Sequence, residues 1–275
     1  MTRIITVANQ KGGVGKTTST VNIAAAVALA GHGVLVIDLD PQGNASTALG
    51  VAHHEGTPSV YEALTGELTL LDVIQACPEV PGLSVAPATI DLAGAEIELV
   101  ALVAREYRLN RAVQAYIEHC ERHLGAAPDF IFLDCPPSLG LLTLNGLVAA
   151  REVLLPIQCE YYALEGLSQL LRTVDMVRTH LNPDLVVSAI LLTMYDGRTR
   201  LASQVADEVR THFGAQVLDT IIPRSVRMSE APSYGQTVIT YDPTSSGALA
   251  YREAAAEVVA LRSNPQSYPQ TNHDK

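Results

Sequence analysis

Short runs of apolar, β-favouring residues alternate along this chain with longer segments of helical periodicity. A strand that is apolar throughout needs cover on both of its faces, and a helix between two such strands lets them run parallel. The alternation therefore predicts an α/β fold, a mostly parallel twisted sheet with helices on both faces. The predicted strands are residues 4–8, 34–37, 83–86, 130–133, 153–157, 187–192 and 217–222.

Helix-period segments fill the intervals between these strands, and no repeat or linker divides the chain. We therefore expect a single domain over residues 1–262. A polar tail follows, residues 263–275, and it is predicted to be disordered. The predicted helices are residues 18–30, 97–124, 164–180, 201–213 and about 246–262.

The sequence contains no pattern that predicts secretion or a membrane span. The apolar start is too short for a signal peptide, and the most apolar segment, residues 21–37, is shorter than the roughly 20 residues of a spanning helix. The four cysteines form no CxxC pair and no dense framework, which argues against a disulfide scaffold. We expect a cytoplasmic protein with no membrane partner.

A glycine-rich segment joins the first predicted strand to the first predicted helix. It reads Asn-Gln-Lys-Gly-Gly-Val-Gly-Lys-Thr-Thr over residues 9–18. Backbone N–H groups of such a turn converge on phosphate oxygens, the helix N-terminus adds positive potential, and glycine lets the backbone approach closely. The segment therefore predicts a nucleotide-phosphate site. Its candidate contacts are Lys11, Gly12, Gly13, Val14, Gly15, Lys16, Thr17 and Thr18.

Lysine usage supports this interpretation. Of the 18 basic residues only three are lysines, and two of these, Lys11 and Lys16, lie in this one segment. The alternative, a flexible glycine turn with incidental lysines, leaves that clustering unexplained. Lys16 is placed to reach the β- and γ-phosphates, and the Thr17 hydroxyl is placed to ligate Mg²⁺. The ordinary phosphate loop has glycine where this chain has Gln10.

The segment Lys-Gly-Gly-Val-Gly-Lys-Thr-Thr resembles the deviant Walker A motif of the ParA/MinD group of P-loop ATPases. Residues 38–44 resemble the group's switch I, and residues 130–138 resemble its Walker B motif and switch II. Residues 158–166 and 222–235 resemble the chromosomal ParA (Soj) branch. The resemblance extends to about residue 261. It implies a P-loop NTPase fold with a deviant Walker A loop, with ATP and Mg²⁺ as cofactors and ATP hydrolysis as the activity.

Three acidic residues follow predicted strands, at the ends where open α/β sheets place their ligands. Asp134 has the position of a Walker B acid that holds Mg²⁺ through water, and Asp38 is placed to bind a metal-bound water or to orient Lys16. The resemblance implies that Asp40 positions or activates the attacking water. The alternative for each acid is a strand-end residue that caps the next helix.

The resemblance also implies an ATP-dependent homodimer. Lys11 would cross the interface to the ATP phosphates of the partner subunit, so that two ATP molecules lie between two subunits. Pro223 and Ser225 would lie beside the adenine base. The alternative for Lys11 is a solvated loop lysine.

The charge balance of −11 excludes a generally basic nucleic-acid coat, but the acid excess is concentrated in the first half. Residues 1–150 carry a net −8 and residues 151–275 a net −3. Arg198 and Arg200 lie in one polar turn, and Arg227 lies in a second one. The resemblance implies that Arg198 and Arg227 bind double-stranded DNA without sequence preference, and Arg200 is a further candidate. The alternative is solvated surface arginines.

The resemblance implies that this protein is a chromosome- or plasmid-partition ATPase on the nucleoid. Its implied partners are DNA and a ParB-type centromere-binding protein that stimulates hydrolysis, and a replication initiator is a further candidate partner. A MinD-like membrane-associated division regulator is the first alternative, but the segment 251–262 is Ala- and Glu-rich rather than basic and amphipathic.

Two further alternatives are a metal-cluster reductase of the same fold and a nucleotide-dependent switch with negligible hydrolysis. The cysteine pattern disfavours the reductase, and Cys135 is expected to be a buried structural thiol. His119 and His123 have a zinc-like i, i+4 spacing, but without an evident third ligand they are expected to lie on a solvated helix end.

Overall fold

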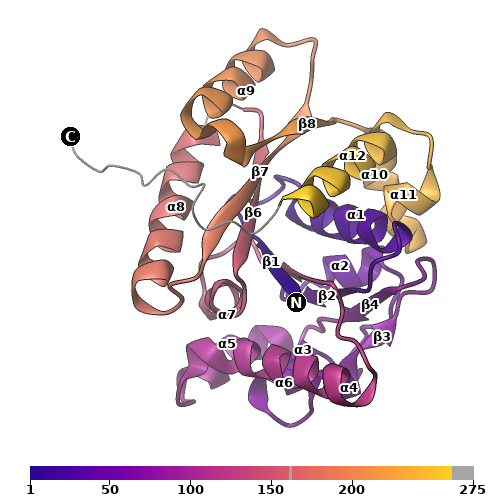
Figure 1. Cartoon of the computed structure of the whole chain (residues 1–275), viewed down its shortest axis with the longest axis vertical. Helices are drawn as coiled ribbons and strands as arrows, with labels where there is room; N and C mark the ends of the chain where they lie inside the picture. The colour runs from indigo at the N-terminus through magenta and orange to yellow at the C-terminus, as the bar shows by residue number, and fades with distance from the viewer. Residues whose placement is uncertain (161–162, 262–275) are drawn as a thin grey trace.

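In a computed structural model, which describes residues 1–160 and 163–261, eight strands form one sheet (Figure 1). The strand order is β3-β4-β2-β5-β1-β6-β7-β8, and every neighbouring pair is parallel except β3 with β4. The predicted fold class is therefore confirmed. The strands are β1 (Arg3–Val7), β2 (Val34–Asp38), β3 (Gln75–Ala76), β4 (Leu83–Ala86), β5 (Phe130–Asp134), β6 (Glu152–Gln158), β7 (Val186–Tyr195) and β8 (Val217–Pro223).

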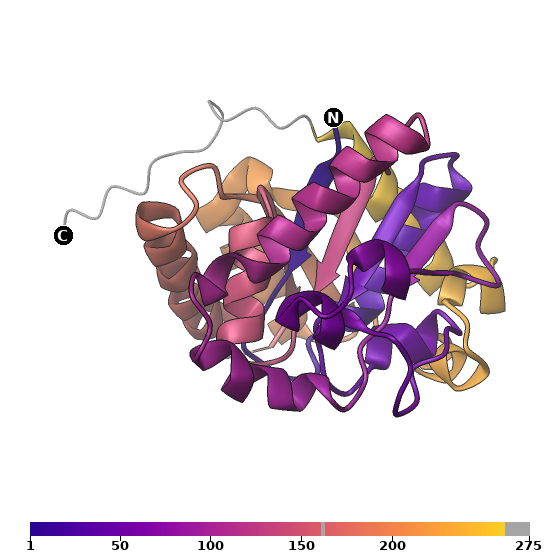
Figure 2. The same ribbon diagram turned by 90° about the horizontal axis from the view of Figure 1, so that it is seen from below.

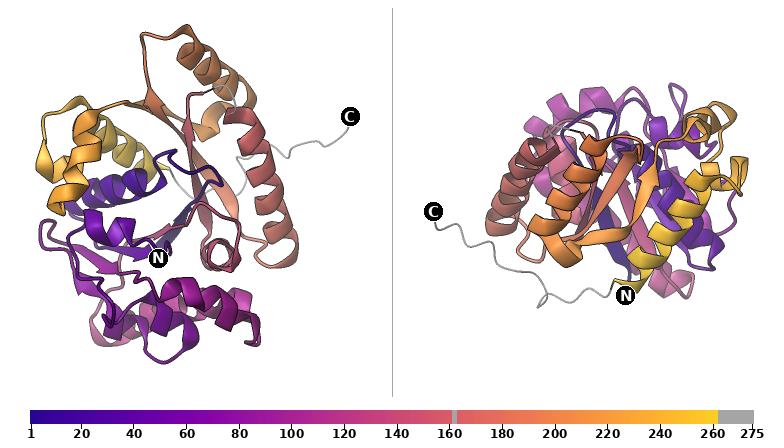
Figure 3. Two further views of the ribbon diagram at one scale, coloured as in Figure 1. Left: turned by 180° about the vertical axis from the view of Figure 1, so that it is seen from behind. Right: turned by 90° about the horizontal axis from the view of Figure 1, so that it is seen from above.

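Helices cover both faces of the sheet, as the apolar strands require. One layer is formed by α3 to α9, of which α3 to α6 are seen in front of the strands in Figure 2, and the views in Figure 3 show α1 beside α12 on the other face. The helices are α1 (Lys16–Leu29), α2 (Asn44–Ala48), α3 (Val60–Thr65), α4 (Leu70–Val73), α5 (Leu92–Val100), η1 (Arg105–Tyr107), α6 (Arg108–His123), α7 (Leu141–Ala149), α8 (Ala163–His180), α9 (Arg200–Phe213), η2 (Gly214–Gln216), α10 (Val226–Glu230), η3 (Ala231–Tyr234), α11 (Val238–Tyr241) and α12 (Ser246–Ala260).

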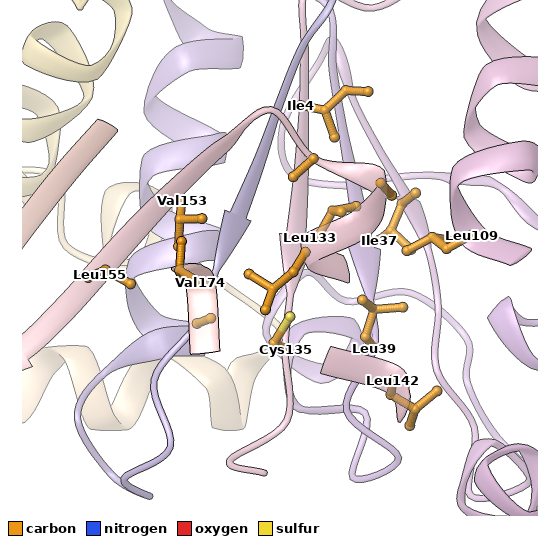
Figure 4. Close-up of a cluster of buried hydrophobic side chains, with 14 of the residues drawn as sticks. Ile4, Ile37, Leu39, Leu109, Leu133, Cys135, Leu142, Val153, Leu155 and Val174 are labelled. Atoms are coloured by element: carbon orange, nitrogen blue, oxygen red, sulfur yellow. The ribbon is translucent and has the colours of Figure 1, made fainter. Parts of the chain in front are cut away.

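The two faces of each strand feed two separate hydrophobic cores. Ile4 points toward the core under α3 to α9, part of which is drawn in Figure 4, whereas Ile5 points toward the core under α1 and α12. Side chains that alternate along a strand project to opposite faces, so a strand apolar at every position fills both cores. This double burial is why the strands could be predicted from short apolar runs.

The predicted helix over residues 97–124 is wrong, because the chain breaks there into α5, η1 and α6. Ala104 has a left-handed φ of 53°, which a continuous helix does not allow. Asn145 on α7 holds the break, since its Nδ2 donates to the Arg105 carbonyl at 2.9 Å and its Oδ1 accepts from the Leu109 N–H at 3.1 Å. A side chain from a distant segment thus ends a helix that local periodicity would continue.

Other differences concern boundaries and short elements. The first helix begins two residues before the predicted start, at Lys16. The helices α2, α3, α4, α7, α10 and α11 and the two-residue strand β3 have no counterpart among the predicted elements. The helix predicted over about 246–262 is described as far as Ala260, and Arg262 and the predicted tail lie outside the described residues. In the described part of the chain, no helix combines the length and apolarity needed to cross a bilayer.

The layer of α1 and α12 provides a test of how strongly the cores stabilise the fold. Phe132 on β5 is fully buried there, whereas Leu29 at the end of α1 is 50% exposed. Truncation of a buried aromatic side chain leaves a cavity, so Phe132→Ala is expected to lower the free energy of unfolding by about 3–5 kcal/mol. Leu29→Ala is expected to change it by less than about 0.5 kcal/mol. Urea unfolding followed by circular dichroism measures both, and equal effects would contradict the assignment of this core.

Candidate functional site

The carboxyl ends of β1, β2 and β5 meet at one edge of the sheet. In the strand register, Asp134 at the end of β5 lies opposite Val7 of β1 on one side and Asp38 of β2 on the other. Because the three strands are parallel, the glycine-rich loop after β1 and the two acids arrive at the same place. This edge is where the structure brings together most of the predicted site residues.

The glycine-rich loop turns through conformations that favour glycine. Gly13 and Gly15 have φ angles of 76° and 85°, in the left-handed region, and α1 begins directly afterwards. Between them, the Val14 side chain is buried, and the Val14 carbonyl accepts a hydrogen bond from Thr193 Oγ1 at 2.8 Å. The loop is thus attached to the end of β7, and the N–H groups at the start of α1 face the edge of the sheet.

Lys16 is enclosed by its own loop. Its side chain is largely buried, and Nζ donates to the Lys11 carbonyl at 3.2 Å. Burial lowers the pKa of the Lys16 ammonium, while the carboxylate of Asp134 acts in the opposite direction. A buried cation held by a single carbonyl at the end of a glycine loop is well placed to receive an anion.

Asp134 is fully buried and is held by two hydroxyls of α1. Thr17 Oγ1 donates to Asp134 Oδ2 at 2.7 Å, and Thr20 Oγ1 donates to Asp134 Oδ1 at 2.8 Å. Burial raises the pKa of Asp134, although these two hydrogen bonds and Lys16 lower it. The acid therefore lies beneath the start of α1, in contact with the predicted metal-binding hydroxyl.

Asp38 is also fully buried, and its partners come from switch I and the helix after it. It accepts hydrogen bonds from the Asp40 N–H at 3.1 Å and from the Ser46 N–H and hydroxyl at 2.9 and 2.7 Å. Burial raises the pKa of Asp38, and the neighbouring Asp134 raises it further, because two carboxylates in one dry place repel each other. Asp38 thus shapes the backbone that carries Asp40.

A cleft of about 360 Å³ opens above these groups. Asp40 lies in its wall, 7% exposed, where its Oδ1 accepts from the Gln42 N–H at 3.0 Å. The predicted residues that line the cleft are Gly12, Gly13, Gly15, Lys16, Thr17, Thr18 and Asp40. The buried Val14, Asp38 and Asp134 support it from below.

Two groups of predicted residues lie outside the cleft lining. Lys11 is on the exposed rim, where its Nζ lies 3.1 Å from Glu160 Oε2 of the same chain. Pro223 ends β8 and Ser225 precedes α10, and neither lines the cleft, whose wall on that side is formed by Met194, Met228 and Pro232.

Sequence reasoning missed several supporting residues. Thr20 lies one helical turn after Thr17 on the same face of α1, a spacing that was visible in the sequence. Ser46 and Thr193 had no such signal, because they reach Asp38 and Val14 only through the fold. Met194, in the cleft wall, has a left-handed φ of 51°, which is strained for a side chain of this size.

The three candidate DNA-binding arginines lie beyond the carboxyl ends of β7 and β8, beside the cleft. The Arg224 N–H donates to the Tyr195 carbonyl at 3.1 Å, which joins the two strand ends. Arg198 is 88% exposed, but its guanidinium forms two hydrogen bonds with Asp196 and lowers the pKa of that carboxyl to about 2. Arg227 Nη1 lies 3.0 Å from Glu230 Oε2. Arg200 is exposed and is the first residue of α9.

The discounted metal signals have ordinary structural surroundings. Cys135 is buried, and the pKa of its thiol is raised by burial. The ring centroids of His119 and His123 lie 4.7 Å apart near the end of α6, with the ring planes tilted by 41°. Among residues 1–160 and 163–261, no group of three or more His, Cys, Asp and Glu side chains is arranged to hold a metal ion by itself.

Comparison with known proteins places this geometry in a family. A family model described as AAA domain matches residues 2–187. Soj, the sporulation initiation inhibitor protein of Bacillus subtilis, is 52% identical over 260 residues, which cover 94% of this chain and 99% of Soj. The chromosome partitioning protein ParA of Myxococcus xanthus is 50% identical over 265 residues, which cover 96% of this chain and 90% of ParA.

A solved structure is similar over nearly the whole chain. Cobyrinic acid a,c-diamide synthase from Mycobacterium smegmatis, with a bound ATP analogue and magnesium, is 40% identical with a TM-score of 0.78, covering 94% of this chain and 95% of that protein. The sheet order, and the glycine loop that leads from β1 into α1, define a P-loop nucleoside triphosphatase fold. Within that class, the chain belongs to the ParA/Soj family of chromosome-partitioning ATPases.

The two buried carboxylates predict how stability depends on pH when no metal ion is present. Because the folded-state pKa of Asp38 is raised, the folded chain binds a proton that the unfolded chain releases above about pH 4. In a chelator, the free energy of unfolding is therefore expected to fall as the pH rises from about 5 to about 8. Asp38→Asn removes one of the two charges and is expected to make this fall shallower.

Urea unfolding at a series of pH values measures the slope. Asp207→Asn, a change of an exposed carboxylate on α9, is the matched control and is expected to keep the wild-type slope. Equal slopes for the wild type and Asp38→Asn would contradict a raised pKa at this site.

Proposed function

We propose that this protein binds ATP with Mg²⁺, forms an ATP-dependent homodimer on nonspecific double-stranded DNA, and drives chromosome partition with a ParB-type partner that stimulates hydrolysis. The observation that carries the proposal is the buried Lys16 at the end of a glycine loop, directly above two buried strand-end carboxylates. Membership of a family of partition ATPases supports the biological role.

The groups present fit a magnesium ion beside a triphosphate. Mg²⁺ prefers oxygen ligands and is commonly held by one or two protein groups together with phosphates and water. The Thr17 hydroxyl and the Asp134 carboxylate supply such oxygens, and they already contact each other at the loop. A cation there would also relieve the repulsion that raises the pKa of Asp38. The metal would neutralise charge that develops on the phosphates.

The chain's own residues then divide the remaining tasks. The loop N–H groups and the Lys16 ammonium would hold the β- and γ-phosphates. Lys16 Nζ would then donate to a phosphate oxygen in place of the Lys11 carbonyl. Asp40 would position the attacking water, because its carboxylate lies in the cleft wall and is anchored by the Gln42 N–H. Alignment and electrostatics supply most of the catalysis in phosphoryl transfer.

Lys11 is the residue that we assign to the partner subunit's ATP. Its contact with Glu160 joins two side chains that are each 45% exposed, and such surface ion pairs contribute only about 0–1 kcal/mol. A phosphate in a second subunit's cleft can therefore displace Glu160. Pro223 and Ser225 remain candidate adenine contacts near the rim of the cleft.

DNA binding would use Arg198, Arg227 and Arg200. The guanidinium groups of Arg198 and Arg227 are exposed although each is paired with an acid, so DNA phosphates can compete for them, and binding is expected to weaken steeply with salt. One patch is small, but a dimer presents two copies that bind one duplex together. This requirement would confine the ATP-bound form to the nucleoid.

The family comparison favours the partition function over a MinD-like membrane role. Half of the chain is identical to Soj and ParA over more than nine-tenths of its length, which favours partition over a MinD-like membrane role. A contact with a replication initiator belongs to the same proposal as a further role of the dimer. Because the named ParA relative is a chromosome partitioning protein, partition of a chromosome is better supported than partition of a plasmid.

The two loop lysines form a matched pair of tests. Lys16→Ala is expected to weaken ATP binding at least tenfold, because a charge-assisted contact to phosphate is lost. Lys11→Ala is expected to keep nucleotide binding and to lose dimerisation. Fluorescent-nucleotide titration and light scattering with ADP or a non-hydrolysable ATP analogue separate the two effects. Tight ATP binding by Lys16→Ala, or an ATP-dependent dimer of Lys11→Ala, would overturn the corresponding assignment.

DNA binding is tested with two arginines in similar local surroundings. Arg198→Glu is expected to reduce the affinity for nonspecific duplex at least tenfold at low salt, with nucleotide-dependent dimerisation unchanged. Arg122→Glu is the control, since Arg122 is likewise exposed and paired with a nearby acid, Glu118, but lies on α6. The measurement is fluorescence anisotropy with the ATP analogue. Unchanged binding by Arg198→Glu would contradict its place in the DNA site.

A further inference from the structure

Helix α5 is apolar on two faces, of which only one is covered. Its inner face packs into the core with Leu92, Ala95 and Leu99. Its outer face carries Ala93, Ile97, Val100 and Ala101, at spacings i, i+4, i+7 and i+8, and every one of these side chains is exposed. Ile97 is 79% exposed and Val100 is 60% exposed, and Val103 beyond the helix end is 90% exposed. We refer to these five outer residues as the α5 stripe.

The segment that leads from β4 to α5 starts at the same edge of the sheet as the cleft. β4 runs parallel to β2, so its end at Ala86 lies beside Ile37, one residue before the buried Asp38. The segment after β4 is hydrogen-bonded to α2, because the Ala88 N–H donates to Ser46 Oγ. The same hydroxyl donates to Asp38. The segment leading to α5 therefore starts from the site itself.

A second connection joins α5 to switch II. α5 packs against α7, which follows the loop of residues 136–140 (Figure 1). The Glu96 carboxylate accepts from the Leu142 N–H at 3.4 Å and lies so close to Gly140 that a side chain at that position would collide with it. Pro137 of the same loop lines the cleft. The loop of residues 136–140 therefore contacts α5 at one end and lines the cleft with Pro137.

We propose that the α5 stripe is a contact surface for a second copy of this chain in the ATP-bound dimer. The inference rests on the proposed ATP-dependent dimer and specifies which surface outside the cleft stabilises it. A symmetric dimer places the same patch of each copy in the interface. Two chains of charge −11 repel each other, so a self-contact is favoured where the surface is uncharged, as the stripe is.

The chemistry of the stripe agrees with a flat apolar contact rather than with a charged ligand. The flanking acid Glu98 accepts a hydrogen bond from the Tyr61 hydroxyl at 2.8 Å. The five side chains of the stripe are uncharged, and the nearby Arg105 guanidinium donates to the Val100 carbonyl at 3.1 Å. A stable interface buries roughly 1,200–2,000 Å² with an apolar centre. The glycine loop and Lys11 are polar, and the stripe would add apolar area to such an interface.

The first test measures whether the stripe becomes covered. The four natural cysteines are buried, so the new thiol of Ile97→Cys is expected to be the one that reacts rapidly with a maleimide. With ADP the labelling is expected to be fast, and with Mg²⁺ and a non-hydrolysable ATP analogue at least tenfold slower. The control is Leu249→Cys, at a 50% exposed position on α12, whose labelling is expected to be the same with both nucleotides.

The second test measures whether the stripe stabilises the dimer. Ile97→Asp is expected to raise the dimer dissociation constant at least tenfold in analytical ultracentrifugation with the ATP analogue, while its affinity for ADP stays at the wild-type value. Leu249→Asp is expected to leave both quantities unchanged. A wild-type chain that stays monomeric with the analogue would overturn the proposed function itself.

Three other results would overturn the stripe assignment alone. These are a wild-type dimer in which the thiol of Ile97→Cys stays reactive, an Ile97→Asp variant that dimerises normally, and an Ile97→Asp variant that loses ADP binding. The last result would mean that α5 supports the cleft within one subunit.

Discussion

Two carboxylates buried side by side at the end of a parallel sheet are the constraint on which the site depends. Asp38 and Asp134 are fully buried in adjacent strands. Asp38 is held by hydrogen bonds from the segment that follows it, and Asp134 by two hydroxyls of α1. Two like charges in one dry place are unfavourable, and the structure meets this cost with hydroxyls, backbone N–H groups and the Lys16 ammonium. A divalent cation and a triphosphate would complete the same arrangement.

These hydrogen bonds also decide which parts of the chain respond together. Ser46 connects Asp38 to the segment after β4, and Thr193 connects the glycine loop to the end of β7. Each connection crosses from one βα unit to another. These hydrogen bonds join the glycine loop to the end of β7, and Asp38 to the segment that leads to α5. The strained Met194 lies at one of these junctions.

The outer contacts of the site are of a different kind. Lys11, Arg198 and Arg227 are exposed and paired with nearby acids, so solvent and other anions can reach each of these cations. A site with a rigid buried centre and exchangeable exposed cations suits a protein whose nucleotide state controls its partners. The proposed DNA binding by a chain with net charge −11 would depend on a few arginines that act together when two copies are joined.

The amino-acid sequence by itself determined the α/β class, seven of the eight strands, and the placement of the glycine loop and the acids at strand ends. These features depend on consecutive residues, since apolar runs and glycine spacing act locally. The roles assigned to Lys16, Asp40 and the arginines stay predictions.

Only the tertiary structure decided which distant residues support that site. Asn145 ends the helix that periodicity would continue, Ser46 and Thr193 reach the acid and the loop across the sheet, and Glu160 holds Lys11 within its own chain. The exposed face of α5 likewise became visible only when its other face was packed. The physical reason is that burial and long-range hydrogen bonds are properties of the folded arrangement, whereas the sequence pattern records only local preference.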